Sequence, residues 1–443
     1  MNFRSFFGLL SLIIIFSCSS DSPTDEDVDT IEAPVDLGTR IVSVEVPDNF
    51  IGARQSFYVL LSDAEGNFID GKEYSNTSET IDFYTKNEFD DSTLFTITFI
   101  SSFNDQSFNL NVYSDLTRSM LGDKIVFKPR GNSLSGGSVE LNVPFYDNGY
   151  VLSATGQGYS ARLIDNKLSG FFTNSFNENL GSEKAFIKYY DPGDVLNGPY
   201  QWAFVEDLNT LSELNISDFT TEDVAVKQLS TNRPGELPLL LLYGFDNENL
   251  YESIASHILY GNYIPAFGFG GNHYYSFADI FDHMVYSIEF TVSKYTVFGV
   301  GIPPSEINVP EISIDSDFKD EKLTFSGIPD FEVGRIRLNN SNNSIQIDFV
   351  FDGQSTAINI PNIPSGVLPD NIARTINEKQ LSLTQALAEN YSSFDNYDDY
   401  ISDVFISSTP FYINSDRRER VFKSFVGPSI LPVFEFPYFQ AFR

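Results

Sequence analysis

Apolar and polar residues alternate along many short segments of this chain. The clearest alternation lies at 95–99, 108–112 and 139–143, where every second residue is apolar. A period of two is that of a β-strand that buries one face. Further strands are expected at 41–46, 57–61, 81–84 and 125–128, and residues 63–67 carry the Asp, Gly and Asn of a turn.

The density of these strands favours a sandwich architecture at the start of the folded part. About seven short strands within about 105 residues, with turn signals between them, are typical of two packed β-sheets. We therefore expect an immunoglobulin-like β-sandwich over 39–144. The cysteine pair and the core tryptophan of antibody domains do not occur in this stretch, so the prediction concerns the architecture alone.

The segment 145–302 predicts a β-rich domain of mixed content. Residues 286–292 alternate as a strand with one buried face. Leu250, Ile254, His257 and Ile258 fall on one helical stripe, which predicts a helix over 249–259. Ser276 and Asp279 have the spacing of a helix start, which predicts a short helix over 276–284.

Prolines 303, 304 and 310 indicate a boundary, because proline removes backbone donors. The segment that follows, 303–443, predicts a β-rich domain with C-terminal helices. Its strand signals are the alternation at 345–351, a hairpin turn at Asp352-Gly353 and a return strand at 357–360.

Two helices and one last strand are predicted near the end of the chain. Leu383, Leu387 and Tyr391 recur every four residues after Ser382, which has the spacing of a capping box with Gln385. A second helical stripe runs over 397–405, and a terminal strand is expected over 434–442. The predicted fold is mainly β: a sandwich followed by a β-rich α+β region of one or two domains.

The first eighteen residues carry a separate signal. Arg4 supplies a positive charge, and an apolar run over 6–16 precedes Ile15-Phe16-Ser17-Cys18. The run is too short to span a membrane and is typical of a targeting segment. The last four residues resemble the lipobox of bacterial lipoproteins, in which the peptide is cut before an acylated cysteine. The resemblance implies a signal peptide at 1–17 and a lipid anchor on Cys18.

Charge and cysteine content narrow the expected partners. Residues 18–38 hold seven acidic residues and no basic one, which predicts a disordered tether. The whole chain has 61 acidic and 27 basic residues, a net charge of −34, which argues against a nucleic-acid partner. Since Cys18 is the only cysteine, lipidation leaves no thiol for a disulfide or for a cysteine-ligated metal.

Metal chemistry is the first candidate activity. His273 and His283 lie close in sequence to Asp279, and imidazole with carboxylate can ligate a divalent metal. The alternative is that such histidines are hydrogen-bonded core residues. The carboxylates at 315–321 could take calcium, with a solvated acidic turn as the alternative. No other cofactor is expected.

Aromatic residues are the second candidate. Tyr200, Trp202, Tyr274 and Tyr275 lie among Gly, Pro and Asn residues. Exposed Tyr and Trp rings provide large contact areas at low entropic cost, so these four are predicted to contact a glycan or a peptide. The alternative is that they fill the core.

These features favour a non-enzymatic lipoprotein of the cell envelope or cell surface, anchored by lipid, that binds a glycan, a peptide or a partner protein. The expected location is the outer membrane, on its periplasmic or its surface face. Two other functions stay open: a hydrolase with a carboxylate or His/Asp metal site in 145–302, and a structural subunit of an envelope complex. No G-x-S-x-G or P-loop motif occurs that would select an enzyme class.

Overall fold

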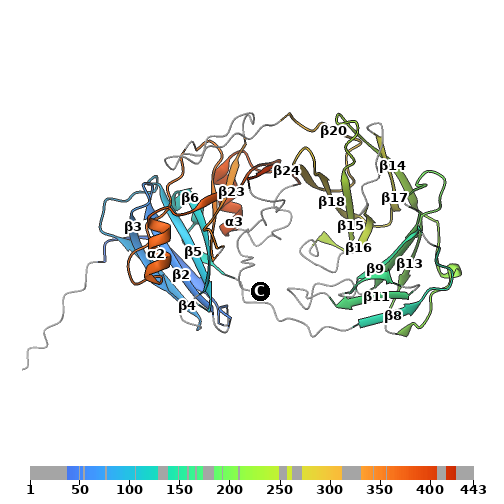
Figure 1. Cartoon of the computed structure of the whole chain (residues 1–443), viewed down its shortest axis with the longest axis horizontal. Coiled ribbons are helices and arrows are strands. Elements are labelled where there is room, and N and C mark those ends of the chain that lie inside the picture. The colour runs from blue at the N-terminus through green and yellow to red at the C-terminus, as the bar shows by residue number, and fades with distance from the viewer. Residues whose placement is uncertain are drawn as a thin grey trace, which may run out of the picture. The chain divides into compact units, whose positions relative to one another are not determined.

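The part of the chain that the computed structural model describes is built mainly of β-strands, which confirms the predicted fold class (Figure 1). The described residues run from 37 to 425, and the excluded positions within that range are 49, 53–54, 75–76, 105, 128–137, 148, 157–158, 165–166, 173–183, 192, 208–209, 249–256, 262–271, 312–330, 343, 356 and 407–415.

One large sheet of twelve strands organises the described residues. Its order is β16 (His257–Gly261), β15 (Leu239–Phe245), β18 (His283–Phe290), β19 (Tyr295–Val300), β24 (Arg417–Ser424), β23 (Ser382–Tyr391), β21 (Val333–Asn339), β22 (Ile345–Asp352), β6 (Ser107–Leu116), β5 (Phe95–Phe103), β2 (Gln55–Asp63) and β3 (Phe68–Glu73). Neighbouring strands are antiparallel except β22 and β6, which are parallel.

Three smaller sheets complete the β-structure. One has six strands, in the order β13 (Gln201–Val205), β12 (Ala185–Tyr190), β9 (Val151–Gly156), β10 (Tyr159–Ile164), β11 (Lys167–Phe172) and β8 (Ser138–Asn142). The others have three strands each: β4 (Glu79–Thr85), β1 (Thr39–Val46) and β7 (Lys124–Val126), and β17 (Asn272–Ala278), β14 (Val224–Thr231) and β20 (Glu306–Ile307). The helices are α1 (Arg118–Leu121), α2 (Asp370–Asn377) and α3 (Tyr397–Ile406).

The N-terminal strands pack as two facing sheets, as the sandwich prediction required. Strands β2, β5 and β6 lie side by side in the large sheet (Figure 1). Their apolar face shares one core with β1 and β4 of a small sheet, through residues that include Val42, Val44, Phe57, Phe83 and Phe99. The immunoglobulin-like strand topology stays a prediction.

The large sheet crosses both expected domain boundaries. The parallel pairing of β6 with β22 joins the segment 39–144 to the segment 303–443. The pairing of β19 with β24 joins 145–302 to 303–443. Local periodicity identifies a strand but contains no information about a partner that lies more than two hundred residues away. The division into three parts did not indicate this pairing.

Three helix predictions were wrong. Residues 382–391 form strand β23, and residues 257–259 of the helix predicted over 249–259 lie in strand β16. The third predicted helix, 276–284, falls on the end of β17 and the start of β18. A recurrence of four residues is an even number, so it places side chains on one face of a strand as well as on one face of a helix.

Of the remaining local predictions, two are confirmed, one is wrong and one is not tested. Helix α3 confirms the stripe over 397–405, whose spacings of three and four exclude a single strand face. The turn after Leu61 is confirmed, because the Asp63 carboxylate accepts hydrogen bonds from the backbone N–H groups of Glu65 and Asn67. The strand predicted at 357–360 is absent, since these described residues belong to no strand. The strand predicted at 434–442 lies outside the described residues.

Candidate functional site

Two of the four predicted ligand aromatics lie in the core. Tyr200 is 2% exposed and Tyr275 is 1% exposed. The Tyr200 hydroxyl donates a hydrogen bond of 2.6 Å to the carbonyl of Leu259. Burial raises the pKa of Tyr200 well above its ordinary value, with a smaller contribution from Tyr190. The structure therefore places these two rings where they hold strands together and where no ligand reaches them.

Trp202 is partly exposed. It lies on β13, half-buried, and its ring stacks on Phe186 with centroids 6.1 Å apart. The indole N–H donates a hydrogen bond of 2.8 Å to the carbonyl of Glu222. Phe204, two residues along the same strand, is 38% exposed and contacts Trp202 edge to face. These contacts fix the Trp202 ring in one orientation at the surface.

Tyr274 lies half-buried on β17, directly opposite Gln228 of β14. Trp202 reaches the same region from the other direction, because Glu222 precedes β14 by two residues. The structure thus places Trp202 near the start of β14 and Tyr274 beside the middle of the same strand.

In the described part of the chain, the outer edge of β14 is paired with another strand only at its C-terminal end. The Ser230 N–H donates to the carbonyl of Ser305, which shows that the backbone of Ser230 faces away from β17. Backbone direction alternates along an antiparallel strand, so Val224, Val226 and Gln228 face the same way. Strand β20 pairs only with Ser230 and Thr231. Three alternate residues of β14 (Val224, Val226 and Gln228) therefore present their N–H and C=O groups to no neighbouring strand among the residues that the structure describes.

Side-chain exposure agrees with this backbone geometry. Val226 is 48% exposed, although valine is usually a core residue of strands. Lys227 and Gln228 are exposed as well. We refer to the outward backbone of Val224, Val226 and Gln228 as the β14 edge.

The edge of the large sheet at β16 is closed in a different way. Side chains from β12 and from the segment after it donate hydrogen bonds to its carbonyl groups: Lys188 to Ile258 at 2.6 Å, Tyr200 to Leu259 at 2.6 Å and Tyr190 to Gly261 at 3.0 Å. Lys188 is 1% exposed, and burial lowers the pKa of its ammonium group to about 7. An unpaired strand edge is a site for pairing with another chain, and these side chains occupy this one.

The predicted metal ligands do not form a metal centre in the described part of the chain. His273 on β17 is 9% exposed and lies 3.2 Å from the Tyr260 hydroxyl through its Nε2. Burial lowers the pKa of His273 to about 4. Asp279 is exposed just after β17, and His283 begins β18. Among the described residues, no group of three His, Cys, Asp or Glu side chains is arranged to hold a metal ion.

Several other predictions concern residues outside the described ranges. They are the lipidation of Cys18, most of the tether predicted over 18–38 and the acidic cluster at 315–321. Within the described ranges, none of the helices has the length and apolar character needed to cross a membrane.

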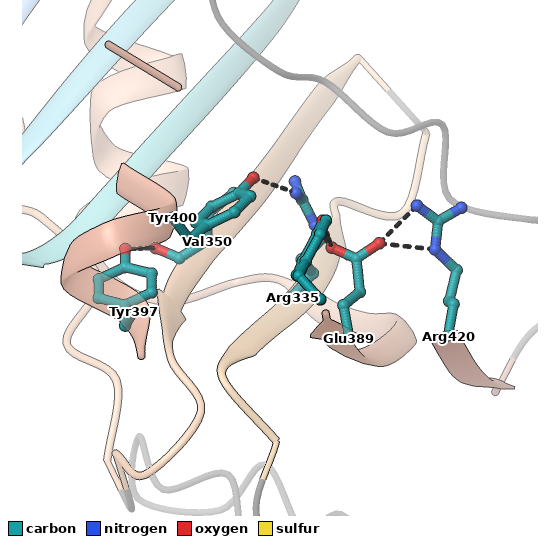
Figure 2. A network of polar contacts seen from close by, with 7 residues as sticks. Arg335, Val350, Glu389, Tyr397, Tyr400 and Arg420 are labelled. Carbon is teal, nitrogen blue, oxygen red and sulfur yellow. Dashed lines mark hydrogen bonds and ion pairs between the residues drawn. The ribbon is translucent and has the colours of Figure 1, made fainter. Parts of the chain in front are cut away.

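A buried charge network links three strands of the large sheet to α3 (Figure 2). Glu389 on β23 is 1% exposed, and its two carboxylate oxygens accept from different arginines. Arg335 Nε of β21 donates at 2.7 Å, and Arg420 Nε of β24 donates at 2.6 Å. The Tyr391 hydroxyl donates to the same carboxylate at 2.8 Å, and Arg335 bonds the Tyr400 hydroxyl of α3.

The electrostatics of this network fix its protonation. Burial alone would raise the pKa of Glu389, but the surrounding arginines, Arg335 foremost, hold that pKa well below its ordinary value. Glu389 is therefore ionised at neutral pH and cannot act there as a general acid or base. The guanidinium group of Arg418 lies over the Phe298 ring, 4.4 Å from its centroid. The arrangement ties β21, β23 and β24 together, which makes it a structural element.

In comparisons with known proteins, no protein-family model and no curated protein matches this chain.

Sequence reasoning missed both the β14 edge and the charge network. Open strand edges depend on which strands pair, and the strand neighbours of β14 come from residues 272–278 and 306–307. One available signal was Pro303-Pro304, since two prolines without N–H groups end a pairing strand. For the network, the Arg-Arg-Glu-Arg run at 417–420 was the available signal.

Proposed function

We propose that this chain is a lipid-anchored lipoprotein of the cell envelope or cell surface that acts as a non-enzymatic binding scaffold for a partner protein or peptide. The observation that carries the proposal is the open β14 edge with the fixed, partly exposed Trp202 at its start. The lipobox resemblance at Ile15–Cys18 supports the anchor. Placement in the outer membrane rests on that same resemblance.

The aromatic setting of Trp202 supports binding at this surface. Its indole N–H is already bonded to Glu222, so a ligand would meet the ring itself. Phe204 adds an apolar ring beside it. Trp202 stacks on Phe186, and Phe204 contacts Phe186 and Phe281. Aromatic side chains that are immobilised before binding lose little entropy when a partner covers them.

Site-specific photo-cross-linking in the cells that produce the protein tests the function. A photoreactive amino acid in place of Phe204 should yield one discrete protein adduct of the full chain. The same amino acid in place of Phe68, which is 41% exposed on β3, is the matched control and should not. Equal labelling from both positions would contradict the proposed scaffold surface.

Tryptophan fluorescence is the second experiment and tests for a carbohydrate ligand. Trp202 is the only tryptophan of the chain, so a change in intrinsic emission reports directly on this surface. A saturable change with an oligosaccharide, together with no adduct at Phe204, would replace the protein partner by a glycan. No adduct and no emission change would refute the scaffold function at this surface.

A further inference from the structure

The β14 edge has the backbone geometry of a strand-addition site. Its outward residues alternate with Ala225, Lys227 and Leu229, whose backbone groups face β17. Five residues of strand, from Val224 to Gln228, span about 17 Å, which is the length of an average strand. A peptide that lies along them could exchange hydrogen bonds at three successive ladder positions.

The chain itself supplies only a short strand, β20, along the outer edge of β14, at the C-terminal end of that edge. Strand β20 lies parallel to β14 beside Ser230 and Thr231. The residues that precede Ser305 are Pro303 and Pro304, which have no N–H to donate. Strand β20 therefore does not extend along the part of β14 that precedes Ser230.

Charge around the β14 edge indicates the kind of segment that fits. Glu222 and Asp223 are exposed at the start of β14, and Glu306 is exposed at its far end. Lys227 is the single basic residue of the strand. Together with the net charge of −34, this arrangement favours a ligand with Lys or Arg at both ends.

The side chains of β14 indicate what the middle of that segment contains. Val226 is nearly half exposed on the face that also holds Tyr274. Cross-strand pairs of β-branched and aromatic residues stabilise a sheet. We propose that an extended segment of a partner protein, β-branched or aromatic in its centre and basic at its ends, adds as a strand to the β14 edge. The inference rests on the proposed scaffold function and names the form of its ligand.

A synthetic peptide with alternating Val and Thr between paired lysines is the probe, and the detergent-solubilised full chain is the receptor. Binding is followed by hydrogen exchange at single-residue resolution. In the free chain the amides of Val224, Val226 and Gln228 should exchange fast, while those of Ala225 and Lys227 are protected by β17. Peptide should slow the first three selectively. Uniform protection along β14, or none, overturns the proposal.

Two matched variants separate backbone pairing from side-chain contact. Val226→Pro removes an outward N–H while leaving the β14–β17 hydrogen bonds in place, as proline is tolerated at strand edges. It should weaken peptide binding at least tenfold, whereas Val226→Thr should bind as the unaltered chain does. A peptide N-methylated on alternate amides of one edge should also fail to bind. Equal affinity for both variants, or for both peptides, overturns the proposal.

Failure of strand addition is distinguishable from failure of the scaffold function. If the Phe204 cross-link to a partner protein persists in Val226→Pro, the scaffold stands and strand addition is refuted. If the adduct disappears in Val226→Pro and persists in Val226→Thr, both are supported.

Discussion

Replacing Glu389 by glutamine tests the reading of the charge network as a structural element. Glutamine keeps the shape of the side chain and one acceptor oxygen but removes the negative charge. Arg335 and Arg420, which are 4% and 5% exposed, would then remain buried without a balancing carboxylate at β23. The substitution thus isolates the charge while it preserves the packing.

The expected loss follows from the burial of the three groups. Removing one partner of a buried ion pair costs about 3–5 kcal/mol, because the remaining charge stays desolvated. The Arg335 guanidinium retains the Tyr400 hydroxyl as a partner, which does not neutralise it. Since native proteins are stable by only about 5–15 kcal/mol, the free energy of unfolding of Glu389→Gln should fall by a large fraction.

Urea denaturation at neutral pH measures this loss, and pH supplies an independent check. The pKa of Glu389 is depressed in the folded chain, so its contribution is fully present above the unfolded value of about 4.3. That contribution disappears as pH falls through the folded pKa. The difference in unfolding free energy between the unaltered chain and Glu389→Gln should therefore be constant near pH 7 and shrink below about pH 4.

A surface pair is the matched control. Glu45 and Lys124 form an ion pair of 2.5 Å, but both side chains are more than one-third exposed. Glu45→Gln should cost less than about 1 kcal/mol. A loss below about 1 kcal/mol for Glu389→Gln as well would refute the argument, because it would mean that solvent already screens the network.

Three further predictions concern other parts of the chain. In the unaltered chain, the free energy of unfolding should rise by up to about 5 kcal/mol between pH 7 and pH 10.5, because in this range Lys188 binds a proton when unfolded and not when folded. Lys188→Met should abolish this rise. Urea titrations across that range measure it, and an unchanged slope would contradict the assignment. Gly334→Ala should lose about 1–3 kcal/mol in the same assay, since its Cβ would lie 2.2 Å from Cε2 of the buried Phe351; no loss would show that the ring moves freely. Cys18→Ser should remove incorporation of labelled fatty acid and release the chain from membranes, and continued labelling would disprove the anchor.

The strands were predictable because their signal is local. Strand β22 shows strict alternation of Ile345, Ile347 and Phe349, whose side chains are all fully buried. Where apolar residues recurred only every four residues, the pattern fitted a strand and a helix equally well. Leu387 in β23 and Ile401 in α3 illustrate the difference, because only the second has apolar neighbours at both three and four residues.

The sequence indicated that aromatic residues contribute to the candidate site, but it did not indicate which of the rings are exposed. Trp202 and Tyr274 were selected for their polar sequence surroundings and lie at the surface. Tyr200 and Tyr275 had the same surroundings and lie in the core. Gly, Pro and Asn residues indicate that a segment lies near the surface. The direction of each aromatic ring depends on its position in the strand and on the sheet that covers that strand. Pairing partners from distant parts of the chain decide both.

The strand edges at β16 and β14 differ in how their outward backbone groups are treated. At β16 the carbonyl groups are occupied by Lys188, Tyr190 and Tyr200, at the cost of burying an amine whose pKa is lowered to about 7. At β14 the described residues place no such side chains beside Val226, and the strand exposes this apolar residue. An exposed edge invites pairing with other chains, so a protein that protects one edge at a cost in desolvation has reason to leave another open only where pairing is useful. The strong negative charge of the chain also opposes pairing between its own copies, which leaves the β14 edge to a partner of opposite charge.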